Sequence, residues 1–416
     1  MSALTRRTLL AATAGLAAPA VHAQGSKTLT MTLWANEAEE AAFRAALAAF
    51  EKLHPGLTIR LEVTGSGAQY YQQIDTRLAG RQAPDVFRVQ YQQIGRYASA
   101  RALVDLGGKF DAAAFAPAFV QAVTYKGHVY AMPHHTDTFA LYYNRDMLRK
   151  IGVQAPATLD ESWSWTQFIG VARRLKQDAG APYGFACAWQ NGTAYRWLPF
   201  LYQHGGRLLG DDFTKARLAD PAGIETIAWT QSWFNDKLVP PGTSIKSNEQ
   251  TQNLFANGTI GMLMGGDWQI PFLDKNMKAE WGVTFMPRDV AMASDLGGNC
   301  LAVTRDAKDR ELATELVAFL ASEAQMREFI TRAQFLPVRN DLIGEKIPYG
   351  LRPDAMQVFV QQATTIPPHL VGTVTLPISS RINAILQDQL DLAFTANRDP
   401  AETARAIDQQ VQVLLG

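Results

Sequence analysis

The stretch that decides the fold is residues 28–63, TLTMTLWANEAEEAAFRAALAAFEKLHPGLTIRLEV. Its first part, Thr28 to Trp34, alternates apolar and polar side chains, which is typical of a strand. From Glu37 to Leu53 the acids come first and apolar residues follow at helical spacing, which predicts a helix with its acids at the favourable N-terminal end. Leu57 to Val63 returns to the strand pattern. A strand, a helix and a second strand therefore open the chain.

The same alternation continues along the sequence. A helix over Gln69 to Ala79 and a short strand over Asp85 to Val89 complete a βαβαβ unit, which predicts a parallel sheet with helices on its faces. Further strands are expected at 139–143, 183–189, 259–264 and 299–304, and further helices at 165–177, 221–235, 249–256, 312–321, 378–396 and 401–414. The second half of the chain also alternates strands and helices, but it contains no internal sequence repeat of the first half.

The length indicates two lobes, since 416 residues exceed one ordinary core. We expect an N-terminal α/β lobe from residues 24–134 plus a later returning segment, and a C-terminal α/β lobe mainly from 139–416. No long linker separates them, so we expect several short crossovers between the lobes, and hence a cleft with a hinge.

Composition narrows the class of partner. Hydrophobic residues make up 47% of the chain, and Lys+Arg equals Asp+Glu at 39 each. A globular chain with a neutral balance and no basic stripe lacks the electrostatic footprint of a nucleic-acid binder.

The N-terminus resembles an export signal. Arg6 and Arg7 precede an apolar run from Leu9 to Ala18, and 21–23 offers small residues for cleavage. The arginine pair is similar to a twin-arginine signal, although an ordinary secretory signal fits as well. Residues 1–23 are therefore expected to be removed, which leaves a protein free in the periplasm.

Two cysteines, Cys187 and Cys300, lie in apolar strand-like runs. The periplasm permits a disulfide between them, but we expect buried free thiols. No metal-ligand spacing accompanies them, and we expect no metal and no cofactor.

Several ordered motifs resemble one family. They include AFEKLHPGL at 49–57, APDV at 83–86, VYAMP at 129–133, LYYNRD at 141–146, GNCLAV at 298–303 and FLPVR at 335–339. In this order the chain resembles the extracellular solute-binding proteins of ABC transporters, in the group with maltose and multiple-sugar binders. The resemblance covers roughly residues 29–415. It implies two α/β lobes joined by a hinge, ligand binding in the cleft between them, and delivery of a sugar or similar polar solute by a monomer to a membrane permease.

Candidate contacts follow from the rule that ligands bind beyond the carboxyl ends of strands in open α/β sheets. Glycines there let the backbone approach a ligand, and Trp268 offers a flat apolar face to a sugar ring. The family resemblance adds the crossover at 134–138, where Asp137 is the favoured contact. The candidates are Asn36, Glu37, Ser66, Gly67, Tyr70, Gln90, His135, Asp137, Trp189, Asn191, Tyr195, Asp267, Trp268, Gly298, Asn299 and Arg339.

Three alternatives stay open. A secreted carbohydrate-active enzyme is one, because paired carboxylates cannot be judged from sequence spacing; no other enzyme motif appears, and we expect no catalysis. A sensor partner that reports its ligand to a receptor is another. The third concerns the ligand: Arg88, His134, His135 and Arg339 could favour an anion such as a sugar acid or glycerol phosphate.

Overall fold

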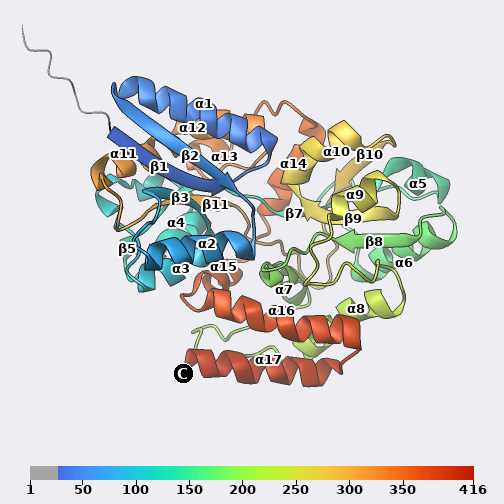
Figure 1. The fold of residues 1–416 in the computed structure, drawn as a ribbon. Coiled ribbons are helices and arrows are strands. Elements are labelled where there is room, and N and C mark those ends of the chain that lie inside the picture. The colour runs from blue at the N-terminus through green and yellow to red at the C-terminus, as the bar shows by residue number, and fades with distance from the viewer. Residues whose placement is uncertain (1–26) are drawn as a thin grey trace, which may run out of the picture.

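The structure is a computed structural model that describes residues 27–416. The export-signal prediction falls on residues 1–23 and lies outside them. Two separate sheets form the centres of two lobes, with helices around each (Figure 1). This is the two-lobe α/β architecture that the sequence predicts.

The sheet of the N-lobe has the order β2-β1-β3-β11-β6. β1 pairs in parallel with both β2 and β3, which confirms the predicted parallel start. β11 runs antiparallel to β3 and β6, so the complete sheet is mixed. The strands are β1 (Lys27–Trp34), β2 (Leu57–Thr64), β3 (Val86–Gln90), β6 (Met132–His135) and β11 (Asn299–Val303).

Helices cover both faces of this sheet, with α1 and α12 on one side and α2 and α3 on the other (Figure 1). β1 is therefore buried from Leu29 to Leu33, including Thr32, although its alternation suggests a half-exposed strand. The helices of the N-lobe are α1 (Glu37–Leu53), α2 (Ala68–Ala79), α3 (Tyr91–Ser99), α4 (Pro117–Val123), α11 (Arg310–Leu320), α12 (Glu323–Ala333) and α13 (Asn340–Ile343).

The first helix begins where its sequence requires. The Asn36 side chain accepts a hydrogen bond from the Glu39 backbone at 2.9 Å, and the Glu39 side chain accepts one from the Asn36 backbone at 2.7 Å. This capping box satisfies two backbone donors that a helix start leaves unpaired. It also fixes the position of the Glu39 carboxylate beside the end of β1.

The C-lobe is built on the sheet β10-β7-β9-β8. Its strands are β7 (Phe139–Asn144), β8 (Tyr183–Cys187), β9 (Ile260–Gly266) and β10 (Trp281–Thr284). Its helices are α5 (Arg145–Lys150), α6 (Trp165–Gln177), α7 (Leu198–Gln203), α8 (Pro221–Asn235), α9 (Thr251–Ala256), α10 (Ile270–Asn276) and α14 (Pro353–Ala363). Short 3-10 turns precede α7 and α10, namely η3 (Ala194–Trp197) and η4 (Asp267–Gln269). Cys187 and Cys300 are buried and unbridged, one in each sheet.

Three helices end the chain, and the first two of them contact the N-lobe. They are α15 (Pro368–Thr375), α16 (Ser379–Ala396) and α17 (Pro400–Leu415). α16 contacts α3 of the N-lobe as well as α8 and η3 of the C-lobe, and it runs beneath both lobes in Figure 1. The Ser379 hydroxyl donates to the Gln92 backbone oxygen at 2.6 Å across this boundary.

The approach of α3 to this boundary depends on a missing side chain. A Cβ on Gly95 would lie 2.7 Å from the Thr375 oxygen and 2.9 Å from the Pro377 nitrogen. Gly170, in helix α6, has open space where a Cβ would be added.

We expect Gly95→Ala to destabilise the protein by about 1–3 kcal/mol, because the added methyl meets backbone atoms. Gly170→Ala should stabilise it by about 0.4–1 kcal/mol. Urea unfolding of both variants measures this, and equal midpoints would contradict the packing described.

Candidate functional site

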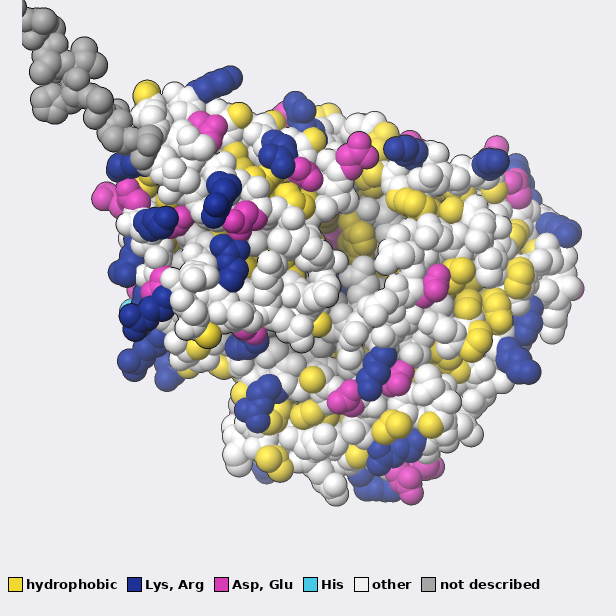
Figure 2. All heavy atoms as spheres, in the orientation of Figure 1, with side chains coloured by type: hydrophobic (Ala, Val, Ile, Leu, Met, Phe, Trp, Pro, Cys, Tyr) yellow, Lys and Arg dark blue, Asp and Glu magenta, His cyan; other side chains and the backbone are white. Residues whose placement is uncertain are grey.

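A hollow of about 500 Å³ separates the lobes at the carboxyl ends of β1, β2 and β3 (Figure 2). From the N-lobe it is lined by Trp34, Ala35, Asn36, Glu39, Thr64, Gly65, Ser66, Arg88, Gln90, Asn299 and Phe335, and from the crossover by Asp137. From the C-lobe it is lined by Gln190, Arg196, Gln250, Gln252, Trp268, Gln269 and Phe272. This hollow is called the cleft below.

The N-lobe wall of the cleft contains a tryptophan that stacks against a paired arginine. The Arg88 guanidinium lies 4.9 Å from the Trp34 ring centroid and donates to the Trp34 backbone oxygen at 2.6 Å. Its other nitrogen, Nη2, lies 2.5 Å from Glu39 Oε1. Both charged side chains are buried, so this pair needs its partners to offset the cost of leaving water. Arg88 is thus occupied by protein groups.

Two histidines lie behind Arg88. His135 Nε2 is 2.8 Å from Arg88 Nη2, and His134 stacks on Phe43 and also contacts Phe329. Burial lowers the pKa of His135 well below its usual range and the pKa of His134 to about 3, with the Arg88 charge acting in the same direction. Both rings are therefore neutral near pH 7 and offer no positive charge to a ligand.

The C-lobe wall repeats this arrangement. The Arg196 guanidinium lies 4.7 Å from the Trp268 ring centroid and 4.6 Å from that of Phe139. Its two terminal nitrogens form ion pairs with Asp137 and Asp295. The Trp268 ring folds back over the end of β9, where a Cβ on Gly266 would collide with it. Gly266 is therefore needed to seat this ring, whereas a Cβ on Gly265 would meet the Gln269 side chain.

Asp267 is buried beneath the C-lobe wall. Neither of its carboxylate oxygens has a hydrogen-bond partner within residues 27–416. Burial, with the neighbouring Asp137 second, raises its pKa well above the usual range. A protonated, neutral carboxyl group is the form that such surroundings stabilise.

Six of the residues predicted from sequence line the cleft: Asn36, Ser66, Gln90, Asp137, Trp268 and Asn299. The Asn36 amide oxygen is used in the helix cap, and the Asn299 amide nitrogen lies 3.2 Å from His135 Nε2. That any of them contacts ligand stays a prediction.

Other predicted residues lie beside the cleft and support it. Gly67 approaches the Asn191 backbone oxygen, so loops of the two lobes meet at one rim. Gly298 has a positive φ of 87° and donates from its backbone to Asp137. His135 and Asp267 lie behind the walls as described. Tyr195 is buried against a smaller hollow that Gln90 and α16 also line.

The last four predicted residues neither line the cleft nor lie at its rim. Tyr70 is in the core, where its hydroxyl donates to the Arg88 backbone oxygen at 2.7 Å. Trp189 is packed among Phe200, Trp233 and Phe394. Glu37 points to solvent at the start of α1. Arg339 pairs with Asp341 and stacks on Phe115, so it does not reach the cleft as a free cation.

Several residues that line the cleft were not predicted from the sequence. Glu39, Gln190, Arg196, Gln250, Gln252, Gln269, Phe272 and Phe335 line the cleft but were not candidates. Arg196 could have been predicted from the sequence, because it directly follows the candidate Tyr195. The glutamines 250 and 252 were both assigned to a helix, whereas α9 starts at Thr251, so Gln250 lies in the preceding loop and Gln252 in the first turn of the helix.

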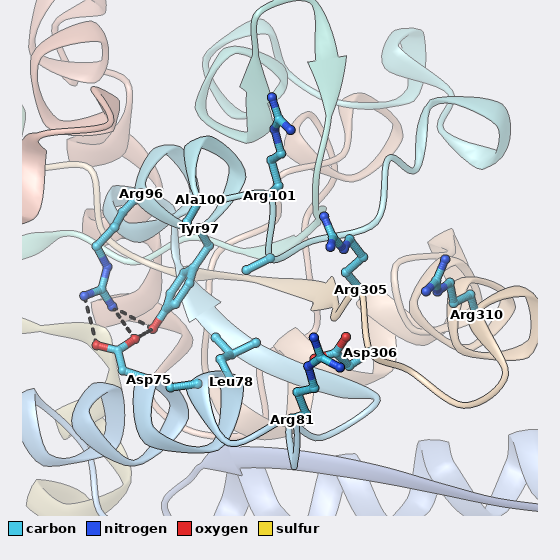
Figure 3. Close-up of a pocket in the computed structure, with 12 residues that line it drawn as sticks. Asp75, Leu78, Arg81, Arg96, Tyr97, Ala100, Arg101, Arg305, Asp306 and Arg310 are labelled. Carbon is cyan, nitrogen blue, oxygen red and sulfur yellow. Dashed lines mark hydrogen bonds and ion pairs between the residues drawn. The ribbon is translucent and has the colours of Figure 1, made fainter.

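A second hollow, of about 670 Å³, lies on the N-lobe at the opposite end of the sheet (Figure 3). Arg96 and Tyr97 hold Asp75 on one side of it, and Arg81, Arg101, Arg305 and Arg310 surround the remainder. It lies near the start of β3, whereas the cleft lies at its end. The carboxyl ends of the parallel strands β1, β2 and β3, beyond which ligands bind in α/β sheets, therefore lie at the cleft and not at this hollow.

Across residues 27–416 no helix is long and apolar enough to span a membrane. The same residues contain no group of three or more His, Cys, Asp or Glu side chains placed to hold a metal ion.

Two α/β lobes with a polar and aromatic cleft between them define a ligand-binding protein of the two-lobe type. Residues 34–327 match the family described as bacterial extracellular solute-binding protein. The chain therefore belongs to this family of substrate-binding transport proteins, as its motifs predicted.

Individual relatives and solved structures are similar to this chain over most of its length. The galactooligosaccharide-binding protein of Bacillus subtilis is 23% identical over 94% of this chain and 90% of its own. The sn-glycerol-3-phosphate-binding periplasmic protein of Escherichia coli is 25% identical over 74% of this chain and 72% of its own. The GacH receptor of Streptomyces glaucescens, solved unliganded and with acarbose, superposes with a TM-score of 0.81 at 23% identity, over 94% of this chain and 98% of that one.

The buried His134 predicts how stability depends on pH. Above pH ~6.5 the imidazole is neutral in the folded and the unfolded chain; below it the unfolded chain binds a proton that the folded chain, with a pKa of about 3, does not. Stability should therefore fall as the pH falls, by about 2 kcal/mol between pH 7 and 5 from this residue alone. His134→Phe, which keeps an aromatic ring packed against Phe43 and Phe329, should reduce that loss. Urea unfolding at the two pH values measures it, and equal losses in both proteins would contradict the assignment.

Proposed function

We propose that this chain binds a neutral sugar in the cleft and delivers it to an ABC transporter permease. The observation that carries the choice of ligand is that both arginines lining the cleft are already paired with carboxylates, Arg88 with Glu39 and Arg196 with Asp137 and Asp295. An unpaired cation strongly favours a phosphate or carboxylate ligand, because it offsets the ligand's loss of water. The two lining arginines and the two lining acids, Glu39 and Asp137, cancel.

The remaining lining groups suit a sugar. Trp34 and Trp268, one on each lobe, offer flat apolar surfaces for the C–H faces of a pyranose. Amide side chains surround them and can both donate to and accept from hydroxyl groups. They are Gln90, Gln190, Gln250, Gln252, Gln269 and Asn299.

The names of the relatives include both neutral sugars and an anionic solute as ligands. The Bacillus subtilis protein is named for galactooligosaccharides and the Streptomyces receptor was solved with acarbose, whereas the Escherichia coli protein is named for glycerol 3-phosphate. An anionic solute is therefore the alternative. It would have to compete with Glu39 or Asp137 for a buried arginine, which is why we prefer the neutral ligand.

The proposal includes export of the protein and movement of its two lobes. Residues 1–23 act as a signal, of the twin-arginine type, and the mature monomer works in the periplasm, with its lobes closing on the ligand by a hinge. N-terminal sequencing of the exported protein checks the first part, since a mature chain that still begins at Met1 contradicts it.

A thermal-shift panel should separate the two ligand classes. Maltose, maltotriose, lactose and galactobiose represent neutral sugars, and glycerol 3-phosphate represents the anions. A ligand at 100 times its dissociation constant adds about 2.7 kcal/mol to the folded state, so a binding sugar should raise the melting temperature clearly. Recovery of that sugar unchanged separates a binder from a glycosidase. A shift with glycerol 3-phosphate and with none of the sugars would overturn the neutral-ligand proposal.

Trp268→Ala should weaken sugar binding by roughly 30-fold or more, which corresponds to about 2 kcal/mol for an aromatic contact at a binding site. The matched control is Trp229→Ala in the same lobe: Trp229 is also half-buried but stacks on Trp165 at 3.7 Å and does not line the cleft. It should cost stability and leave affinity unchanged. Calorimetric titration and a melting curve on both variants measure the two effects. Unchanged affinity of Trp268→Ala would show that the ring is only a packing residue.

A further inference from the structure

Two of the segments that cross between the lobes meet at one buried side chain. The first, residues 136–138, joins β6 of the N-lobe to β7 of the C-lobe, and the second, residues 285–298, joins β10 to β11. Arg196 of the C-lobe pairs with one acid from each, Asp137 at 3.1 Å from Nη2 and Asp295 through Nη1. All three side chains are buried.

Each of these acids is tied to the backbone of the other segment. Asp137 Oδ2 accepts a hydrogen bond from the Gly298 nitrogen at 2.7 Å, and Asp295 Oδ1 accepts one from the nitrogen of Phe139, where β7 begins, at 2.9 Å. A Cβ on Gly297 would collide with the Asp137 side chain, and one on Gly298 with the His135 backbone. The two segments are thus packed closely and joined reciprocally, with the guanidinium at the centre.

The same guanidinium faces the ligand site. Arg196 lines the cleft and stacks on Trp268, the ring proposed to hold the sugar. One rigid, planar group therefore contacts the binding surface and both connecting segments. The other cleft arginine differs: Arg88 pairs with Glu39, Trp34 and His135, all within the N-lobe.

We propose that Arg196 is a positioning residue that couples the seating of the sugar on Trp268 to closure of the lobes. A ligand shifts a conformational equilibrium only by its difference in affinity for the two states. A sugar on Trp268 restrains the ring, the ring restrains the stacked guanidinium, and the fork of the guanidinium sets the relative position of Asp137 and Asp295. The inference rests on the proposed function.

Arg196→Lys is the direct test, because lysine keeps the charge but lacks the planar fork that can hold two carboxylates at once. Closure is measured by the distance between labels on Gln72→Cys in α2 and Lys275→Cys in α10, both exposed and on opposite lobes. The native Cys187 and Cys300 are buried, which protects them from labelling. The ligand is the panel sugar that raises the melting temperature most, at saturating concentration. Arg88→Lys is the matched control.

We expect the parent protein to show a shorter distance with sugar, and Arg196→Lys to show less than about half of that shortening even when saturated. Arg88→Lys should bind more weakly yet reach the full shortening once saturated. Full shortening of Arg196→Lys at saturation overturns the inference and leaves Arg196 as a contact residue alone.

Two further outcomes are distinguishable. If Arg196→Lys does not fold, Asp137→Asn replaces it: this change weakens one arm of the fork while Arg196 stays paired with Asp295, and the shortening should again be incomplete. A parent protein that binds none of the sugars overturns the proposed function, and the inference with it. A parent protein that binds and closes, beside an Asp137→Asn variant that closes fully, overturns the inference alone.

Discussion

Chain segments that join two lobes must pass beside the ligand site, and here two of them share the ionic contacts of Arg196. Asp137 and Asp295 would be costly buried charges without that guanidinium, since breaking a buried pair leaves an uncompensated ion. The guanidinium in turn depends on both acids. Phe139, Gly297 and Gly298 complete the junction through backbone contacts that larger residues would block at the two glycines. This junction therefore joins the two sheets directly beside the cleft, which Asp137 and Arg196 line.

Each lobe uses the same local device to present an aromatic surface. Trp34 stacks on Arg88, which pairs with Glu39; Trp268 stacks on Arg196, which pairs with Asp137 and Asp295. A paired arginine holds a ring in place from behind without adding net charge to the cleft. The open face of each ring is then available to a ligand. The two lobes thus reach similar surfaces from unrelated sequences.

The fold could be predicted from sequence because its signals are local. The helix from Glu37 to Leu53 was predicted with the bounds that the structure shows, since its cap, its acids and its apolar spacing lie within one segment.

The binding site could be predicted only in part. The environment of Arg88 depends on Glu39, 49 residues earlier, and on His135, 47 residues later. Tyr70 and Trp268 look alike as aromatic residues near strand ends, and only the packing of distant segments buries the first and places the second in the cleft. Arg339 was misjudged although Asp341, its partner, lies two residues away.

The brace on the C-lobe wall of the cleft comes from a helix far along the chain. In α16, Asn383 accepts from the Tyr195 nitrogen at 2.8 Å and donates to the Gly192 oxygen at 2.8 Å, while Gln387 accepts from the Gly192 nitrogen at 2.6 Å. These partners are separated by 188 to 195 residues. At a synthesis rate of about 5–20 residues per second, α16 is therefore made on the order of ten seconds or more after the loop at 190–195 that it supports. For part of that time the nascent chain also lacks β11, the strand between β3 and β6, so neither the N-lobe sheet nor the binding site can be complete.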